Sequence, residues 1–234
     1  MSEPSIVVAD TAEDLVSRVA EDFLALVSEV LEAKPVANIV LTGGSLGIAL
    51  IGELAKLNLD LTKLRFMFGD ERFVALDHED RNEFQGISVF RELANNSLLR
   101  YPAANSDLLT GQSLMNKAMT MSYGSAEEAS EVFDLVILGL GPDGHVASLF
   151  PGHQSNGEWI TAEQASPKPP SERLSLSYAA LNRANQVWFL ASGAQKALVV
   201  SSALNDEDCE LPLAKVKGLQ STSWYLDREL SDAL

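Results

Sequence analysis

The sequence has 234 residues, of which 33 are Asp or Glu and 17 are Lys or Arg, so its formal net charge is −16. Because 46% of the residues are hydrophobic, the chain can bury a large apolar core, which excludes a disordered acidic segment. A charge of this size repels the phosphate backbone of nucleic acids, so we expect no nucleic-acid partner. By the same argument, even a small phosphorylated ligand is disfavoured at first sight.

The N-terminal residues carry no basic segment that would indicate a signal peptide. No apolar stretch approaches the roughly 20 residues that a membrane span needs, so we expect no membrane partner. The single cysteine, Cys209, allows no intrachain disulfide. We therefore expect a cytoplasmic protein, and we further expect a monomer or a weak homo-oligomer.

Strand-like and helix-like segments alternate through most of the chain. Residues 6–9 are predicted to form a strand, and 11–32 a helix with Thr11 as its N-cap and with apolar residues at helical spacing: Val19, Phe23, Leu26 and Val30. Later elements are predicted as strands over 38–41, 64–68, 133–138, 186–191 and 223–226, a helix that ends near residue 56, and a helix over 194–203.

Near-continuous apolar strands separated by helices are typical of a parallel sheet that is covered on both faces. We therefore predict an α/β fold with an open, mostly parallel, doubly wound sheet and helices on both faces. Residues 153–172 contain three prolines and few apolar residues, and we interpret them as a long surface loop near the site. Because sheet-like segments continue on both sides of it, residues 1–234 are expected to form a single domain.

Two glycines and a serine directly follow the second predicted strand, in Thr42-Gly43-Gly44-Ser45. Glycines let backbone N–H groups point at a common centre, the next helix N-terminus adds partial positive charge, and Ser45 adds a hydroxyl donor. This turn suits a phosphate or a carboxylate, although the missing Gly-Lys-Ser/Thr ending of a P-loop disfavours a nucleoside triphosphate. The alternative interpretation is a tight strand-to-helix turn with a serine cap.

The stretch Gly139-Leu140-Gly141-Pro142-Asp143-Gly144-His145 follows another strand and matches G-x-G-x-x-G. A dinucleotide site needs a full helix after the third glycine, and Pro151-Gly152 interrupts too early for one, so we reject the NAD interpretation. Ligands of open α/β sheets bind at the carboxyl ends of strands, where this turn lies. Because Asp143 can fix the tautomer of His145, the pair favours a general base over a structural histidine.

Three cations lie near the ends of predicted strands, namely Arg72, Arg173 and Lys196. In a parallel sheet such positions converge on one crevice, which favours an anion site, whereas each cation alone could be a surface charge. A metal site is disfavoured, because His145 and His153 are eight residues apart, which matches no common zinc spacing.

Together these motifs resemble the 6-phosphogluconolactonase family, which is related to the glucosamine-6-phosphate deaminases. The most specific part is the glycine-rich stretch from Gly139 to His145 with Val146-Ala147-Ser148-Leu149-Phe150-Pro151-Gly152 after it. The resemblance runs nearly end to end and includes Leu41-Thr42-Gly43-Gly44-Ser45, Phe68-Gly69-Asp70-Glu71-Arg72-Phe73-Val74, Arg81-Asn82, Ser166-Pro167-Lys168-Pro169-Pro170, Arg173-Leu174-Ser175-Leu176 and Gly193-Ala194-Gln195-Lys196. The chain departs from the family pattern at Leu46-Gly47, at Ala75 and over 115–131.

The resemblance implies hydrolysis of 6-phospho-D-glucono-1,5-lactone to 6-phosphogluconate in the oxidative pentose phosphate pathway, with no metal and no organic cofactor. It implies that His145 is the catalytic histidine and that Asp143 supports it. The implied phosphate site consists of Gly43, Gly44, Ser45, Arg173 and Lys196. Asp70 and Arg72 are expected to form part of the active-site wall.

Two other functions compete with this one. An amino-sugar phosphate deaminase/isomerase needs more acid–base groups, and the related deaminases carry a glutamate five residues after the motif histidine, where this chain has Phe150. A non-catalytic sugar-phosphate sensor would not need both Asp143 and His145. A single phosphate needs only two glycines, a serine, a helix end and a few cations, so the net charge does not exclude a sugar phosphate.

Overall fold

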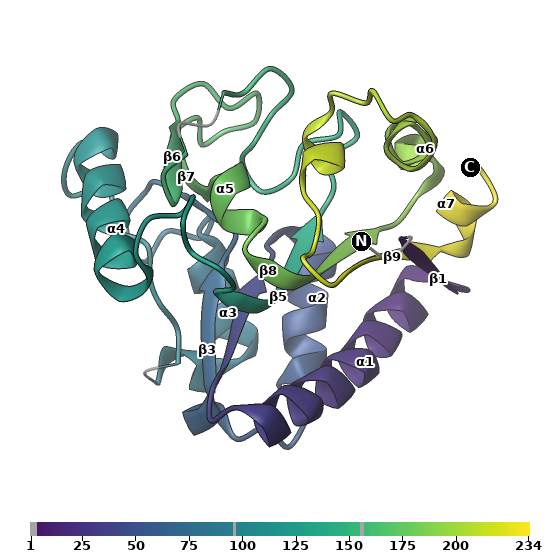
Figure 1. The fold of residues 1–234 in the computed structure, drawn as a ribbon, viewed down its shortest axis with the longest axis horizontal. Helices are drawn as coiled ribbons and strands as arrows, with labels where there is room; N and C mark the ends of the chain where they lie inside the picture. Colours follow the sequence, from purple (N-terminus) through teal and green to yellow (C-terminus); the bar gives the residue numbers. More distant parts are fainter. Residues whose placement is uncertain (1–3, 96, 155–156) are drawn as a thin grey trace.

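The computed structural model describes residues 4–95, 97–154 and 157–234 and is organised around a six-stranded sheet (Figure 1). All neighbouring strands in this sheet are parallel, in the order β1-β9-β8-β5-β2-β3. The strands are β1 (Ser5–Ala9), β2 (Ala37–Leu41), β3 (Leu64–Phe68), β5 (Phe133–Gly139), β8 (Ala184–Ala191) and β9 (Ser221–Asp227). The predicted open parallel sheet is confirmed, and each predicted strand is present.

Helices cover both faces of the sheet, which explains why its central strands are apolar throughout. Helices α1 (Ala12–Ala33) and α2 (Gly44–Leu54) pack on each other and on one face, and α5 (Tyr178–Leu181) and α6 (Ala197–Asn205) lie on the other side (Figure 1). In β5, all residues from Phe133 to Leu138 are buried. Burial on both faces is expected of strands in a doubly wound sheet.

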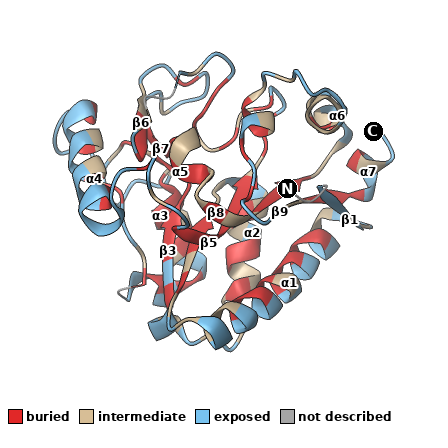
Figure 2. Ribbon diagram, viewed as in Figure 1, coloured by how far each residue is buried: buried red, intermediate tan, exposed pale blue. Residues whose placement is uncertain are grey.

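Helix α1 begins as predicted, at an N-cap formed by Thr11. The Asp14 N–H donates to Thr11 Oγ1 at 3.1 Å, and the Thr11 hydroxyl donates to the Asp14 carboxylate at 2.7 Å. Leu15, Val19 and Phe23 form a buried stripe, and Figure 2 shows this stripe facing the sheet while the opposite side of the helix is exposed. None of the helices in the described ranges is both long enough and apolar enough to span a bilayer.

A second, three-stranded sheet was not predicted. It pairs β4 (Asp70–Arg72), β7 (Arg173–Leu176) and β6 (Ile160–Glu163), all antiparallel. The interpretation of 153–172 as surface loop is therefore wrong in part, because β6 lies within it and Ile160 is fully buried. These strands have only three or four residues, too few for periodicity to reveal, and they form through contacts with distant segments.

Four further α-helices in the described residues were also missed: α3 (Asn82–Val89), α4 (Leu108–Tyr123) and the one-turn helices α5 (Tyr178–Leu181) and α7 (Arg228–Ser231). Helix α3 packs against α2, and α4 packs on the small sheet. Two shorter differences concern predicted helices: α2 ends at Leu54, and the helix expected over 194–203 begins as a 3₁₀ turn (Ala194–Lys196) that leads into α6.

The strand order reverses between β2 and β5, and this reversal creates a crevice. From β2 the chain moves outward to β3, whereas from β5 it moves through β8 to β9 in the opposite direction. The turn Thr42–Ser45 follows β2, and the turn Gly139–His145 follows β5. Ligands of open α/β sheets bind at such switch points, so the fold brings together the two glycine-rich motifs.

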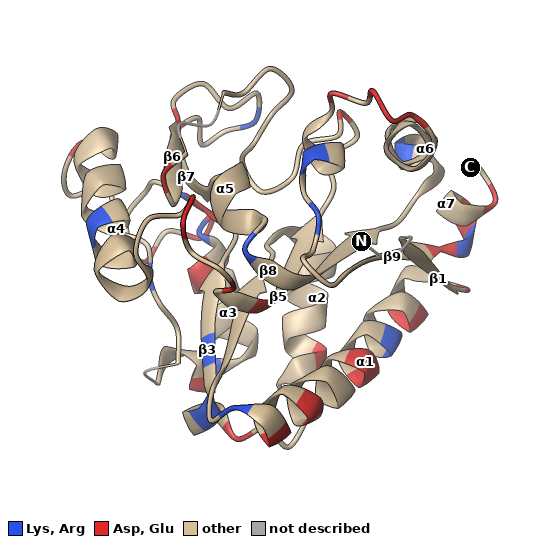
Figure 3. Cartoon of the chain, in the orientation of Figure 1, with Lys and Arg blue, Asp and Glu red and all other residues tan. Residues whose placement is uncertain are grey.

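Acidic side chains are spread over the outside of the fold. Figure 3 shows them along α1 and in the segment that follows α6, with few basic residues between them. Most of the charge of −16 therefore lies on the outer surface, and the charge of the crevice has to be judged from the residues that line it.

Candidate functional site

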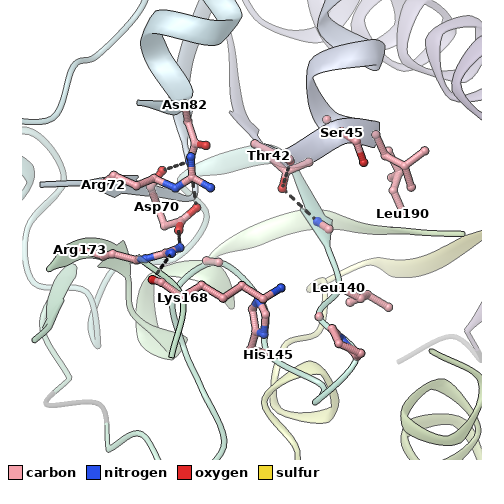
Figure 4. A pocket seen from close by; sticks show the side chains of 18 of the residues that line it. Thr42, Ser45, Asp70, Arg72, Asn82, Leu140, His145, Lys168, Arg173 and Leu190 are labelled. Atoms are coloured by element: carbon pink, nitrogen blue, oxygen red, sulfur yellow. Dashed lines mark hydrogen bonds and ion pairs between the residues drawn. The ribbon is translucent and has the colours of Figure 1, made fainter. Parts of the chain in front are cut away.

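A cavity of about 380 Å³ opens at the carboxyl ends of β2 and β5 (Figure 4). Its volume lies within the roughly 300–1,000 Å³ that is typical of small-molecule sites. Most residues singled out from the sequence line it: Gly43, Gly44, Ser45, Asp70, Arg72, His145, Arg173 and Lys196. Asp143 does not line the cavity and reaches it through its contact with His145.

The turn after β2 leaves the N-terminus of α2 uncapped. Helix α2 begins at Gly44, and its N-cap, Gly43, has no side chain with which to cap it, so the first-turn N–H groups are available to a ligand. Gly44 has a φ of +76°, a conformation that favours glycine. A Cβ on Gly43 would lie 1.9 Å from the Asn82 side-chain oxygen. Both glycines are therefore needed for the geometry of this turn.

His145 and Asp143 form the expected pair. The Nδ1 atom of His145 lies 2.5 Å from Asp143 Oδ1, which assigns the proton to Nδ1 and leaves Nε2 as the basic nitrogen. Partial burial of Asp143 favours its neutral form, but the hydrogen bond and charge of His145 outweigh this and hold the pKa of the carboxyl below its usual value. The Phe150 ring packs against the imidazole at 4.7 Å between centroids.

Asp70 and Arg72 form one wall of the cavity. The Ser148 hydroxyl donates to Asp70 Oδ2 at 2.5 Å, and Asn82 Nδ2 donates to Asp70 Oδ1 at 3.3 Å. Arg72 donates from Nη1 to the backbone carbonyl of Asp80. These contacts hold both side chains in place before any ligand binds.

The guanidinium of Arg173 makes more contacts within the protein than expected for a side chain whose only role is to bind a phosphate. Its Nε donates to the Pro170 carbonyl at 3.1 Å and its Nη2 to the Lys168 carbonyl at 3.0 Å, while Nη1 lies 3.9 Å from Asp70. Burial lowers the pKa of this guanidinium, as does Arg72, and Asp70 opposes them. Two of its three nitrogens thus anchor the 166–170 segment.

Lys196 lies at the end of the 3₁₀ turn after β8, on a backbone held by Asp227. The Ser192 hydroxyl donates to this carboxylate at 2.5 Å and the Gly193 N–H at 3.1 Å. Burial lowers the pKa of the Lys196 ammonium, Lys168 lowers it further, and Asp227 opposes both. An ammonium that has lost much of its hydration gains more from an anionic ligand than an exposed one.

A buried carboxylate supports the Asp70–Arg72 wall from behind. Glu71 accepts backbone N–H bonds from Arg72 and Asn82 at 2.8 Å and from Glu83 at 2.9 Å. Burial raises the pKa of Glu71 to about 7, although these N–H donors and Arg81 lower it. Glu71 thereby joins β4 to the start of α3.

Several lining residues lie in the segments that match the family but had no predicted role, among them Asn82 and Lys168. Asn82 is almost fully buried; its Nδ2 donates to the Asp70 backbone carbonyl at 2.8 Å, while its Oδ1 lies against Gly43 with no hydrogen-bond partner among the described residues. Lys168 stands between two prolines in a segment with no periodicity. The pair Arg81-Asn82 and the position of Lys168 between two prolines are the local signals that could have pointed to these residues.

The other histidines lie elsewhere. His153 Nε2 is 3.1 Å from Thr161 Oγ1 and its Nδ1 is 3.4 Å from Glu163, and His78 lies beside Asp80 on the surface. Within residues 4–95, 97–154 and 157–234, no group of three or more His, Cys, Asp or Glu is arranged to hold a metal ion.

Comparison with known proteins identifies the family. The family model of glucosamine-6-phosphate isomerases/6-phosphogluconolactonase matches residues 10–224. The chain belongs to this family. The 6-phosphogluconolactonase of Mycobacterium tuberculosis is 31% identical over 98% of each chain, and that of Mycobacterium leprae is 30% identical over 96% of each.

Solved structures of family members have the same fold. The 6-phosphogluconolactonase of Trypanosoma brucei superposes with a TM-score of 0.86 at 28% identity over the full length of both chains. That of Thermotoga maritima gives 0.84 at 26% identity and covers 97% of this chain and all of its own. The fold of these family members therefore extends over nearly the whole of this chain.

Gly141 is required for the His145–Asp143 pair, which leads to a first prediction. A Cβ at position 141 would lie 2.0 Å from His145 Nδ1 and 2.5 Å from Asp143 Oδ1. We expect Gly141→Ala to separate the pair, so that the hydrogen-bonded ring N–H resonance of His145 disappears from the NMR spectrum. Gly52→Ala, in α2 with open space around it, is the control and should leave the resonance unchanged.

Burial of Glu71 predicts a pH dependence of stability. Because its folded pKa of about 7 exceeds the ordinary value of 4.5, its contribution is fully present below pH 4.5 and is lost as the pH rises through 7. Relative to Glu71→Gln, the free energy of unfolding of the wild type should fall by roughly 3 kcal/mol across this range. Urea titrations at several pH values measure the difference, and a difference independent of pH would contradict the raised pKa.

Proposed function

We propose that this protein hydrolyses 6-phospho-D-glucono-1,5-lactone to 6-phosphogluconate, with His145 as general base and then general acid and with no metal or organic cofactor. The observation that carries the proposal is the His145–Asp143 pair, which shares one cavity with the uncapped Gly43–Ser45 turn and with Lys196. Relatives matched over nearly their whole length, which are named 6-phosphogluconolactonases, support the choice of substrate.

The charges of the cavity fit a sugar phosphate. Four cations line it, Arg72, Lys168, Arg173 and Lys196, against the single carboxylate of Asp70 among the described lining residues. The phosphate is assigned to the Gly43–Ser45 turn and Lys196, because a helix N-terminus, a hydroxyl and a desolvated ammonium meet there. Binding the phosphate at this end positions the lactone ring towards His145.

Hydrolysis of the lactone needs few catalytic groups, because a lactone is an activated ester. His145 Nε2 takes a proton from water while the water oxygen bonds to C1 and the carbonyl oxygen becomes an oxyanion. When the oxyanion collapses, the bond between C1 and the ring oxygen breaks, and the imidazolium returns its proton to that oxygen. Asp143 keeps the ring in one tautomer and stabilises its charged form.

The environment of His145 disfavours the deaminase/isomerase alternative. That reaction opens a sugar ring and moves a proton between carbons, and it needs a carboxylate beside the histidine. Here the corresponding position is Phe150, whose ring packs on the imidazole. An apolar ring at this place fits a reaction that uses a single acid–base group.

One assay separates the competing functions. Purified protein is given fresh 6-phosphogluconolactone in the presence of EDTA, with NMR or a pH-stat following the lactone, and glucosamine 6-phosphate in parallel. Lactone loss well above the spontaneous rate is expected. Loss at the spontaneous rate would refute the proposal, and release of ammonia would favour the deaminase.

Removal of the general base should affect turnover more than binding. We expect His145→Ala to lower kcat by at least about 10²-fold, because general acid–base catalysis contributes roughly 10²–10⁴-fold, while the Kd for 6-phosphogluconate changes little. Steady-state kinetics and calorimetry measure the two quantities. A near-normal kcat would remove His145 from the mechanism.

Removal of the cation that is proposed to bind the phosphate should affect substrate binding more than turnover. We expect Lys196→Ala chiefly to raise KM for the phosphorylated lactone and to leave kcat within a few-fold, since the phosphate is remote from the reacting carbon. Unphosphorylated gluconolactone serves as the control substrate, and its turnover should be insensitive to the substitution. Equal effects on both lactones would argue that Lys196 does not contact the phosphate.

A further inference from the structure

We propose that Lys168 is a catalytic residue of this site: its ammonium stabilises the negative charge that develops on the lactone carbonyl oxygen and then binds the carboxylate of the product. The inference rests on the proposed hydrolysis and assigns the oxyanion donor, which the His145–Asp143 pair does not supply. A preorganised donor aimed at a developing oxyanion is commonly among the largest contributions to acyl-transfer catalysis.

The backbone near His145 is largely committed to the fold. The Gly139 N–H donates to Thr42 Oγ1 at 3.0 Å, Gly141 donates to the His145 carbonyl at 3.0 Å, and Gly144 donates to the Gly141 carbonyl at 3.1 Å. Pro142 has no N–H. The turn that carries the histidine therefore does not present a row of free N–H groups to the cavity, and a side-chain cation is the better candidate.

The two arginines of the cavity are already engaged. Arg72 donates from Nη1 to the Asp80 carbonyl, and its Nε is buried without a partner among the described residues. Arg173 uses Nε and Nη2 on backbone carbonyls and turns Nη1 towards Asp70. Arg173 is thus held against the wall by two carbonyls and faces Asp70, whereas Arg72 is anchored at the wall through Nη1 alone.

Lys168 combines a fixed backbone with an uncommitted ammonium. Its carbonyl accepts hydrogen bonds from the Ser166 hydroxyl and from Arg173 Nη2, both at 3.0 Å. Its side chain lines the cavity and points from the 166–170 segment towards His145 (Figure 4). In the part of the chain that the structure describes, the ammonium makes no ion pair and no hydrogen bond, so it is available to a ligand.

The two lysines divide the cavity between two anionic groups. Lys196 lines this cavity and a neighbouring one together with Ser45 and Leu46 from the first turn of α2. Lys168, in contrast, points towards the histidine. Their mutual repulsion contributes to lowering the pKa of Lys196, as expected for two ammonium groups that face one space. A ligand with a phosphate at one end and an oxyanion or carboxylate at the other relieves this repulsion, which matches both the transition state and the product.

The test removes the charge of Lys168 and compares two ligands that differ only at C1. We measure kcat for the lactone, and Kd for 6-phosphogluconate and for glucitol 6-phosphate, which has no carboxylate. We expect Lys168→Gln to lower kcat at least about tenfold and to weaken 6-phosphogluconate about tenfold, because a charged donor is lost, and to change glucitol 6-phosphate less than twofold. Lys168→Arg should retain most of the activity.

Controls separate this role from others. Lys117→Gln, an exposed lysine on α4, should change none of the three values. An equal loss of affinity for both phosphorylated ligands would show that Lys168 binds the phosphate, and a wild-type kcat in Lys168→Gln would show that it has no role at C1; either result overturns the inference alone. A wild-type protein without lactonase activity would refute the proposed function and this inference with it.

Discussion

The site depends on the pairing of β2 with β5 at the point where the strand order reverses. Each strand ends in a glycine-rich turn, and the two turns are joined by the hydrogen bond from the Gly139 N–H to Thr42 Oγ1. If β5 paired anywhere else, the uncapped end of α2 and His145 would not share a cavity. The parallel pairing is therefore what brings the glycine-rich turn after β2 next to the His145–Asp143 pair.

The opposite wall of the cavity comes from the small antiparallel sheet and from buried charges behind it. Glu71 holds the start of α3, Asn82 donates to Asp70 and lies against Gly43, and Arg173 anchors the segment that carries Lys168. Each of these groups is fixed by several hydrogen bonds, so the wall is ordered in the absence of substrate. Such preorganisation is what an electrostatic role in catalysis requires.

Much of this arrangement could be predicted from the sequence, for identifiable reasons. The central strands are buried on both faces, so their apolar runs are continuous, and Thr11 and the two glycine-rich turns carry local signals of their own. The order of the strands could not be predicted, because it depends on pairing between distant segments. The short strands β4, β6 and β7 were missed for the same reason, and also because they contain charged residues such as Asp70 and Arg72. The engagement of Arg173 with loop carbonyls was equally unpredictable, since it exists only once the loop has folded.

The acidic composition does not conflict with a phosphorylated substrate, because the surface charges act only over short distances. Water and salt screen exposed charges within about 10 Å, so the carboxylates along α1 contribute little field inside the cavity. There, four cations face one carboxylate, and two of the cations are tied to the wall. The remaining ammonium groups, Lys168 and Lys196, are available to the phosphate and, in the proposed mechanism, to the charge that develops at C1.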